Sequence, residues 1–575
     1  MPGPGHHLLA AVEERLGRSP VAAESLSRPF SQECLTHMTQ LTSRSLASLA
    51  FAAALALGAD AQTRRGAMEM QADHWDVSPP LASIKPIQVE KDYYLDKTEA
   101  RPPRPFSTDR ATGQADGALA AQDAPQPDVN VVNGLNFDGV GVPNYGVNVA
   151  PPDTNGSVGR TVSGAGYYVQ WVNLAFSVYN KATGALVYGP ANGNTIWSGF
   201  GGVCATTNDG DPIVLYDKMA NRWVFMQFAV SSTPYTQCVA VSADSNPLSS
   251  YSRYAFTYGT QFNDYPKAGV WPDGYYVTYN MFNNGATFSG GWACAMDRAK
   301  MLAGQAATQQ CFNLGTSYGG LLPADLDGAT LPATGTPNYV MNFGSSRLNV
   351  WKFKVDWANA ANSTLSGPTA LTTASFSKGC SGGTCIPQSG TSQKLDSLAD
   401  RLMYRLAYRQ FPTYGAMVVN HTVAVGKQAR TGQTGVRWYE VRVNSAGTPS
   451  IFQQGTFTNG SGTGDGLYRW MGSAAMDKAG NIALGYSVSG SGMRPSVRFT
   501  GRGAGDALGT MGAEFTIQNG AGSQTTGLSR WGDYASMSVD PDDDCTFWFT
   551  TEYLKSNGTW NWSTRVGSFK LNGCQ

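Results

Sequence analysis

The feature that most constrains the fold of this chain is a pair of segments that recurs seven times between residues 151 and 553. Each first segment carries an acidic residue, Arg or Trp beside small residues, and each second segment alternates aromatic and β-branched residues. The first segments are 151–159, 210–217, 264–274, 325–331, 399–409, 469–480 and 530–544. The second segments are 167–173, 222–230, 275–282, 338–343, 416–423, 481–488 and 545–553. Short strands at steady spacing, separated by Gly, Asn and Asp turns, are typical of all-β repeat proteins.

The repeat predicts an all-β fold, a seven-bladed β-propeller over residues 136–575. Most repeats continue into a third strand with period-2 patterning, as in 237–243, 348–355, 435–443 and 564–571. Propellers have four to eight blades of four strands each. Six blades is the alternative, because the first repeat is the weakest match, and a tandem of β-sandwiches is another. We expect a strand near 131–137 to complete the last blade and close the ring.

The first 135 residues are expected to lie mostly outside this fold. An apolar run at 46–58 follows Arg44 and ends in Ala-Asp-Ala at 59–61, which is typical of a secretory signal peptide over 38–61. Thirteen apolar residues are too few to span a bilayer as a helix. A core helix of a cytosolic protein is the alternative. We interpret residues 1–37 as a gene-start error upstream of Met38, and 62–135, which lack apolar periodicity, as a disordered linker or pro-segment that touches the domain surface in places.

The cysteine count agrees with a secreted protein, extracellular or periplasmic. Eight cysteines follow the apolar run, and an even number in an exported chain suggests four disulfides. Pairing of neighbours is the simplest connectivity: Cys204 with Cys238, Cys294 with Cys311, Cys380 with Cys385, and Cys545 with Cys574. Zinc is the competing interpretation, but no C-x-x-C occurs and only His74 and His421 follow the apolar run.

Charge and missing motifs narrow the function. The chain has 41 Lys and Arg against 41 Asp and Glu, which argues against a nucleic-acid partner. No regular transmembrane helix follows the signal peptide, and we expect a monomer. Neither G-x-S-x-G nor H-E-x-x-H occurs, which disfavours a serine or zinc hydrolase. His421 is a strand residue, for which we expect a packed or hydrogen-bonded side chain and not a catalytic base.

The repeat also predicts where a site would form, because the first strand of each propeller blade lines the central channel. Polar residues of the first segments would therefore meet at the channel mouth. The catalytic candidates are Asp211, Asp264, Asp400 and Asp533, with Glu440 or Glu552 as outside options. The substrate-binding candidates are Arg405, Arg469, Arg530, Tyr265 and Trp271. The same set includes Asp153, Asp325, Asp327, Arg401 and Lys267. The alternative is that such Asp residues bond backbone amides of the next blade and only hold the ring together.

Two chemistries would use clustered carboxylates. A glycoside hydrolase needs two of them flanking the bond, one kept protonated, and arginines could clamp a substrate carboxylate. Alternatively, Asp oxygens could hold Ca²⁺, either in the channel or in DPDDD at 540–544. That turn lacks EF-hand spacing, so a solvated acidic turn is the preferred interpretation. We expect no cofactor, with Ca²⁺ as the alternative.

Three motifs resemble those of a group of large, uncharacterised, secreted bacterial β-propeller proteins. They are PPDTNGSVG…YYVQWVN at 151–173, RWMGSAAMDKAGNIALGYSVS at 469–489 and RWGDY…DPDDDCTFWFTTEY at 530–553. That group is similar at fold level to sialidase-like propellers. F/Y-R-I-P and S-x-D-x-G-x-T-W are absent from this chain, and WPDGYYVTYN at 271–280 is similar to a stretch of arabinanase-like propellers. The resemblance implies a fold and transfers no catalytic residue.

From these patterns we expect a protein that binds extracellular or cell-surface polysaccharide as a non-enzymatic recognition or adhesion module. The alternative is a glycoside hydrolase or other glycan-active enzyme that uses carboxylates at the channel mouth. The two hypotheses can be told apart, because the binding module predicts an aromatic-lined face that contains no carboxyl group with a shifted pKa.

Overall fold

The computed structural model describes residues 63–88, 95–96, 116–119, 127–147, 149–425, 432–458, 465–525 and 527–575. The expected signal peptide and the segment before it lie outside these residues. Residues 60–575 form one compact unit. Among the described residues no helix is long and apolar enough to cross a membrane.

The unit is built almost entirely from antiparallel runs of four strands, in which each strand pairs with the next along the chain. The first runs are β7–β10 (Asn155–Val158, Tyr167–Val172, Ala175–Asn180, Leu186–Asn192), β11–β14 (Ile213–Asp217, Arg222–Ala229, Thr236–Ser242, Tyr251–Thr257) and β15–β18 (Gln261–Trp271, Gly274–Asn283, Thr287–Met296, Thr308–Asn313). Next come β19–β22 (Leu322–Asp327, Asn338–Gly344, Arg347–Lys354, Thr364–Thr372), β25–β28 (Met403–Gln410, Gly415–Ala424, Thr434–Val443, Pro449–Phe457) and β29–β32 (Tyr468–Met476, Ile482–Gly490, Met493–Arg502, Phe515–Gln518).

The last run joins the two ends of the domain. Strands β33 (Ser536–Val539), β34 (Phe547–Leu554) and β35 (Trp562–Leu571) are completed by β5 (Val131–Asp138), which pairs antiparallel to β35 with Asn136 opposite Gly567. The sequence predicted this closing strand. Because β5 pairs with β35, the first and last strands of the domain lie in the same sheet.

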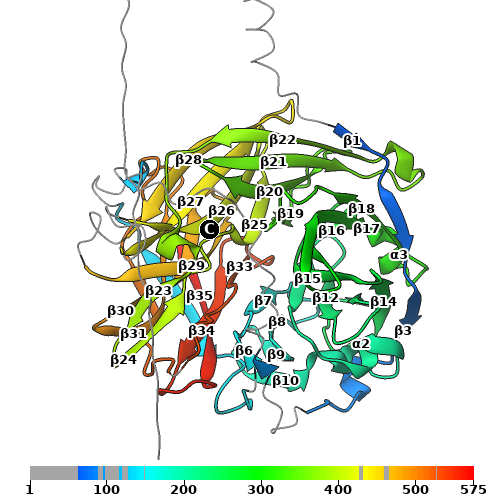
Figure 1. The fold of residues 1–575 in the computed structure, drawn as a ribbon, viewed down its shortest axis with the longest axis horizontal. Coiled ribbons are helices and arrows are strands. Elements are labelled where there is room, and N and C mark those ends of the chain that lie inside the picture. The colour runs from blue at the N-terminus through cyan, green and yellow to red at the C-terminus, as the bar shows by residue number, and fades with distance from the viewer. Residues whose placement is uncertain are drawn as a thin grey trace, which may run out of the picture. The chain divides into compact units, whose positions relative to one another are not determined.

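The first strands of successive runs lie next to one another and form a closed circuit. β7 contacts β11, β11 contacts β15, and the series continues through β19, β25, β29 and β33 back to β7. Figure 1 shows the sheets following one another around this common centre. β19 and β25 pair in parallel, with Ala324 opposite Leu406, so these inner strands run in the same direction. The arrangement is all-β and propeller-like.

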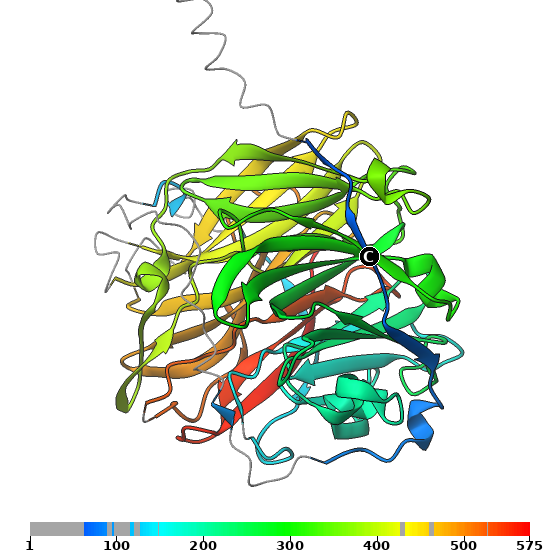
Figure 2. The ribbon, with the colours of Figure 1, turned by 45° about the vertical axis from the view of Figure 1, so that its right-hand side comes forward.

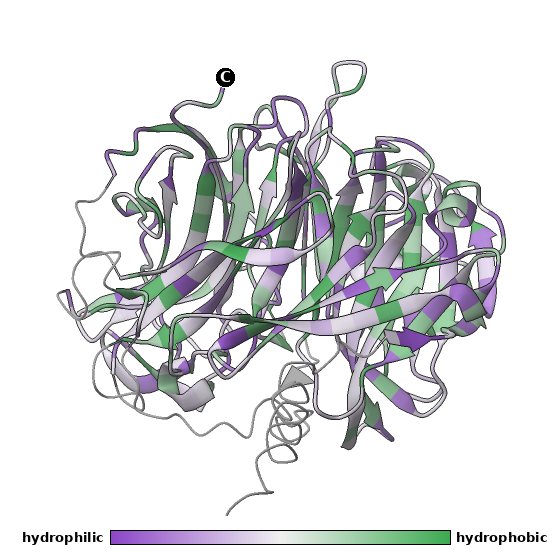
Figure 3. Ribbon diagram, turned by 90° about the horizontal axis from the view of Figure 1, so that it is seen from above, coloured by the Kyte–Doolittle hydropathy of each residue, from purple (hydrophilic) through white to green (hydrophobic). Residues whose placement is uncertain are grey.

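The core lies between the faces of neighbouring sheets. Alternating hydrophobic and hydrophilic stretches run along the strands (Figure 3), as expected where each strand presents side chains to both faces. Aromatic rings meet across these faces: Phe499 of β31 stacks on Phe569 of β35 at 3.7 Å between centroids, and Trp271 meets Tyr408 edge-to-face at 4.7 Å. Such pairs stabilise beyond the apolar area they bury, which accounts for the 11% aromatic content.

The segment before the domain is partly built into it. Residues 63–77 form β1 (Thr63–Arg65), β2 (Met68–Gln71) and β3 (His74–Val77). These pair as outer edge strands with β22, β18 and β14 respectively, and Figures 1 and 2 show them running along the outside of three sheets. The expected disordered linker does not hold for these residues, because three sheet edges offer unpaired backbone groups that a passing chain can bond.

The remaining elements are short. A hairpin of β23 (Thr384–Gln388) and β24 (Thr391–Asp396) precedes β25, and β4 (Leu95–Asp96) pairs in parallel with β6 (Val149–Ala150). Within the described residues the α-helices are α2 (Gly202–Thr206) and α3 (Arg298–Leu302). The 3-10 turns are η1 (Leu81–Ser83), η3 (Gly193–Trp197), η4 (Ala360–Asn362) and η5 (Gly379–Gly382).

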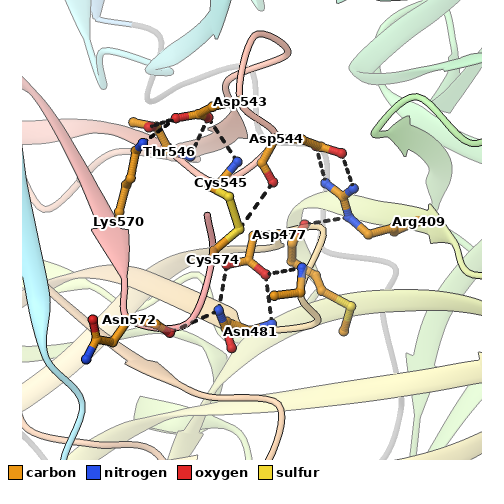
Figure 4. The surroundings of a disulfide bond; sticks show 12 residues. Arg409, Asp477, Asn481, Asp543, Asp544, Cys545, Thr546, Lys570, Asn572 and Cys574 are labelled. Carbon is orange, nitrogen blue, oxygen red and sulfur yellow. Dashed lines mark hydrogen bonds and ion pairs between the residues drawn. A yellow bond between two sulfur atoms is a disulfide. The ribbon is translucent and has the colours of Figure 1, made fainter.

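The four disulfides form between neighbouring cysteines as the sequence predicted. They join Cys204 to Cys238, Cys294 to Cys311, Cys380 to Cys385 and Cys545 to Cys574. The last one ties the C-terminus to the turn before β34, in the surroundings drawn in Figure 4. Structural disulfides of this kind are typical of proteins made in an oxidising compartment.

Candidate active site

A group of charged and aromatic side chains gathers where the inner strands begin. Asp153 and Asp211 each stand two residues before an inner strand, β7 and β11, and Asp400 and Asp533 each stand three residues before β25 and β33. Asp264 lies at a bulge within β15, between the pairs Asp264–Asn280 and Lys267–Thr278. We call the following residues the mouth cluster: Asp153, Asp211, Asp264, Tyr265, Lys267, Asp400, Arg401, Arg530, Asp533, Tyr534 and Glu552.

The backbone at these positions has an unusual conformation that recurs around the ring. φ is +46° at Asp153, +46° at Asp211, +52° at Tyr265 and +61° at Asp533, in the left-handed region that non-glycine residues seldom adopt. The same position of the fourth run is Gly320, with φ +57°. Left-handed residues of this kind cost free energy and cluster at functional sites. Three of these residues, Asp153, Asp211 and Asp533, are short acids from separate runs of strands, and the charges of all three act on Lys267.

Lys267 occupies the middle of the cluster. Its side-chain nitrogen lies 3.5 Å from the centroid of the Tyr265 ring and 3.8 Å from that of Tyr534, and it donates a hydrogen bond to the Pro266 carbonyl at 2.8 Å. Lys267 is only 1% exposed. Burial lowers its pKa to about 8, although the charges of Asp211, Asp153 and Asp533 act in the opposite direction.

The two arginines of the cluster are each paired with an acid. Arg401 donates to both carboxylate oxygens of Asp400, at 3.0 and 3.3 Å, and its guanidinium carbon lies 4.5 Å from the Tyr265 ring centroid. Arg530 forms the same two-point contact with Asp533, at 3.2 Å through Nε. Bidentate pairs of this type hold both partners in a fixed orientation.

Asp264 is a carboxyl group of the mouth cluster whose pKa is shifted to near neutral pH. Burial and the charge of Asp211 together raise the pKa of Asp264 to about 7, against the opposing effects of Arg401 and Lys267. Both Asp264 and Asp211 are partly exposed. The site therefore holds one carboxyl group that is half protonated at neutral pH beside a second carboxylate that interacts with it.

The cluster contains buried polar atoms without a hydrogen-bond partner among the described residues, and they include the Tyr265 hydroxyl and two others. The Tyr534 hydroxyl has none, and neither does the second carboxyl oxygen of Glu552, whose first oxygen accepts a bond from the Gly532 amide at 2.7 Å. Each of the two residues is 1% exposed. Burial raises the pKa of Glu552 well above its ordinary range, with a contribution from Asp533. Unpaired buried polar atoms are costly, so these two are candidates for contact with a ligand.

Three of the expected substrate-binding residues do not join the mouth cluster. Arg405 is 3% exposed and pairs with Asp325 at 2.8 Å and Asp327 at 2.6 Å. Arg469 is fully buried between Asp465 and Glu514. Trp271 packs between sheets and donates its indole N–H to the Thr336 carbonyl at 3.0 Å. Their substrate-binding roles are not supported, because each of these side chains is fully engaged with protein partners.

Arg405 lies on the inner strand β25 and belongs to a second group of charged residues. Together with Tyr404, Ser157 and Ser538 it lines a small internal cavity between the inner strands. Its acid partners Asp325 and Asp327 are balanced by Arg405 itself and by Lys218, which pairs with Asp327 at 2.6 Å. Arg530 and Tyr265, by contrast, lie in the mouth cluster with the four catalytic candidates.

The acidic turn 540–544 and His421 have structural roles. Asp543 accepts bonds from the Cys545 and Thr546 amides and pairs with Lys570 at 2.7 Å, and Asp544 pairs with Arg409 at 2.6 Å (Figure 4). His421 is buried, with Nε2 2.9 Å from the Tyr439 hydroxyl, and burial lowers its pKa well below its ordinary range. In the part of the chain that the structure describes, no three His, Cys, Asp or Glu side chains are placed to hold a metal ion together.

Sequence reasoning missed Tyr534 and ranked Glu552 only as an outside option. Glu552 lies on the second strand of its run, β34, inside the apolar stretch 547–554, where a charged residue stands out in the pattern. Tyr534 directly follows Asp533 in the sequence, but nothing in the local pattern distinguishes it from a packing aromatic.

Comparison with known proteins gives a distant likeness in structure and none in sequence. No family model and no curated protein matches the chain. A GH93 α-L-arabinofuranosidase of Fusarium graminearum matches at 9% identity over 75% of this chain and 98% of its own, with a TM-score of 0.33. An exo-β-1,3-galactanase from Clostridium thermocellum matches at 11% over 77% and 99%, with a TM-score of 0.29. A PL25 ulvan lyase matches at 11% over 76% and 80%, with a TM-score of 0.26.

The expectation of a non-enzymatic recognition module is wrong. It required a site without a perturbed acid, whereas the mouth cluster holds Asp264, with a pKa of about 7, and Glu552, with a pKa well above its ordinary range. The structures just named are all glycan-active enzymes, and TM-scores this low transfer neither an activity nor residue roles to this chain. None of the three is a sialidase, so the sialidase-like part of the resemblance gains no support from them.

Proposed function

We propose that this protein is a secreted glycan-active enzyme, a glycoside hydrolase, whose reaction takes place at the mouth cluster of a seven-bladed β-propeller. The blade count is supported by the circuit of inner strands from β7 to β33 and by the closing strand β5. Secretion is supported by the four disulfides. We further propose that residues 38–61 are a signal peptide and that residues 136–575 form the propeller. We also propose that the protein is a monomer and that its partner is a polysaccharide.

The observation that carries the proposal is the pair formed by Asp264 and Asp211. Glycoside hydrolysis needs one carboxyl group that is protonated at working pH and a second that is ionised. The charge of Asp211 helps to raise the pKa of Asp264 to about 7, which is near the optimum for a general acid in neutral solution.

In this mechanism Asp264 donates its proton to the glycosidic oxygen as the bond from that oxygen to the anomeric carbon breaks. Asp211 supplies the second carboxylate, which attacks the anomeric carbon or takes a proton from the attacking water, according to the separation of the two groups. Arg401 and Arg530 act as positioning residues, because each fixes one acid of the cluster.

The test is product analysis with the purified chain on a panel of polysaccharides, measuring new reducing ends. We expect wild type to cleave at least one glycan, and Asp264→Asn and Asp211→Asn to lose at least 100-fold in kcat/KM, in the range of a lost acid or base. Asp273→Asn is the matched control, since burial raises the pKa of Asp273 to about 6 outside the mouth cluster, and it should keep wild-type activity. Cleavage that survives both mouth variants would refute the proposal.

A further inference from the structure

The charge balance of the mouth cluster limits which glycans it can bind. It contains six carboxyl groups, from Asp153, Asp211, Asp264, Asp400, Asp533 and Glu552, against the three cations of Lys267, Arg401 and Arg530. Two of these carboxyl groups, Asp264 and Glu552, are held in the protonated form more readily than usual. Even with both of these groups protonated, four carboxyl groups face three cations, so the site does not offer net positive charge.

The three cations of the cluster already have partners within the protein. Arg401 contacts both oxygens of Asp400, and Arg530 contacts both oxygens of Asp533. Lys267 is held between two tyrosine rings and bonded to the Pro266 carbonyl. A substrate carboxylate or sulfate would therefore have to displace an aspartate from its arginine. Of the arginines predicted to clamp a substrate carboxylate, Arg530 lies in this cluster, and its pairing with Asp533 argues against that role.

The buried groups without hydrogen-bond partners include uncharged donors, among them the hydroxyls of Tyr265 and Tyr534. The Tyr534 hydroxyl is buried among Asp153, Asp211 and Asp533, whose charges act on it, and the second carboxyl oxygen of Glu552 is likewise unpaired. A sugar hydroxyl can accept from a phenol or a protonated carboxyl and donate to a carboxylate. These groups therefore match the hydroxyl pattern of an uncharged sugar and supply no countercharge for an anion.

Building on the proposed function, we infer that the substrate is an uncharged glycan cleaved by hydrolysis, and that glycans bearing uronate or sulfate are excluded. Water is the co-reactant: its oxygen bonds to the anomeric carbon, the glycosidic bond breaks and the leaving oxygen gains a proton. Eliminative cleavage of a uronate would instead need a positive group to stabilise charge developing on the substrate carboxylate. The cluster holds its cations in pairs with its own acids, so this route is disfavoured.

The first experiment compares matched glycans. The purified chain is incubated with uncharged arabinan, galactan and dextran and with polygalacturonate and dextran sulfate. New reducing ends report any cleavage, and ultraviolet absorbance reports the unsaturated ends left by elimination. We expect cleavage of an uncharged glycan at least tenfold faster than of any anionic one, without ultraviolet-absorbing product. Faster cleavage of an anionic glycan, or unsaturated ends, would overturn the inference while leaving a glycan-active enzyme in place.

If no glycan is cleaved, the proposed function fails, and affinity electrophoresis in gels containing the same polysaccharides still decides the inference. Retardation by an uncharged glycan and not by polygalacturonate supports it, and any other pattern overturns it.

The second experiment removes an acid from one pair. Asp400→Asn takes away the carboxylate that Arg401 contacts, so we expect the ratio of polygalacturonate binding to uncharged-glycan binding to rise at least fivefold. Asp465→Asn is the control, because it opens an arginine–aspartate pair outside the mouth cluster and should leave the ratio unchanged. An unchanged ratio in Asp400→Asn, with unfolding midpoints showing that both variants fold, would contradict the inference.

Discussion

Replacing Asp264 by Asn should stabilise the protein while abolishing its activity. Wild type must carry a carboxyl group whose pKa rises from 3.8 to about 7 on folding, because of burial and the nearby charge of Asp211. Above pH 7 this group is ionised in an environment that favours its neutral form. Asn has nearly the same shape and no charge, so the variant does not bear that cost. Stability gained at the expense of function is typical of strained active sites.

The magnitude follows from the change in pKa. An increase of about three units in the pKa of Asp264, at about 1.4 kcal/mol for each unit, corresponds to about 4 kcal/mol of unfolding free energy. Solvent reaches part of the Asp264 side chain and screens the interaction, so we expect about 2–4 kcal/mol.

The sign of the pH dependence is fixed by linkage. A carboxyl group with a raised folded pKa contributes stability that is fully present below pH 3.8 and is lost as pH rises to 7, because in that window the folded state holds the proton more tightly. Asp264→Asn should therefore match wild type near pH 4 and exceed it progressively up to pH 7, with a constant difference above. Lys267, whose pKa lies near 8, titrates in both proteins above this window.

The assay is urea unfolding of wild type and Asp264→Asn at several pH values between 4 and 8, with the free energy of unfolding extrapolated to water. A difference that does not change between pH 4 and 8, or a variant less stable than wild type at pH 8, would refute the reasoning. Either result would mean that the Asp264 side chain is better solvated than its placement implies.

Three further predictions follow from the same contacts. Asp327→Asn should show the opposite pH dependence, because ion pairs lower the pKa of Asp327: it should lose about 3–5 kcal/mol at pH 7 and approach wild type as pH falls below 4 in the same urea assay. Lys267→Met should move the alkaline limb of the pH–rate profile upward, since the charge of Lys267 lowers the pKa of Asp264; an unmoved limb would exclude this coupling. Replacing Cys545 and Cys574 by Ser opens a loop of 29 residues and should cost about 4 kcal/mol in urea unfolding, whereas unchanged stability would show that the bond constrains little.

Much of the fold could be predicted because the repeat supplies the same local signal many times. Alternating strands and turn residues predicted the sheets, and the closing strand at 131–138 was expected from the need to complete the last run. The pairing of the cysteines followed from the same locality. The edge strands at 63–77 could not be predicted, because they are short and their partners, β22, β18 and β14, lie far along the chain.

The candidate site was only half predictable. Asp211, Asp264, Asp400 and Asp533 could be proposed as site residues because each lies shortly before or within the inner strand of its repeat. Arg405 and Arg469 occupy first strands as well, yet pair with acids outside the mouth cluster. The position of a residue in the sequence predicts the strand on which it lies, but not the side chain with which it pairs. That partner decides whether its charge is available to a ligand.

The most direct test of the central claim is the dependence of kcat/KM on pH for cleavage of an uncharged glycan. We expect an alkaline limb near pH 7, where Asp264 loses its proton, and loss of at least 100-fold in Asp264→Asn. A rate that stays constant to pH 9, or an Asp264→Asn variant with wild-type kcat/KM, would contradict the assignment of Asp264 as the general acid.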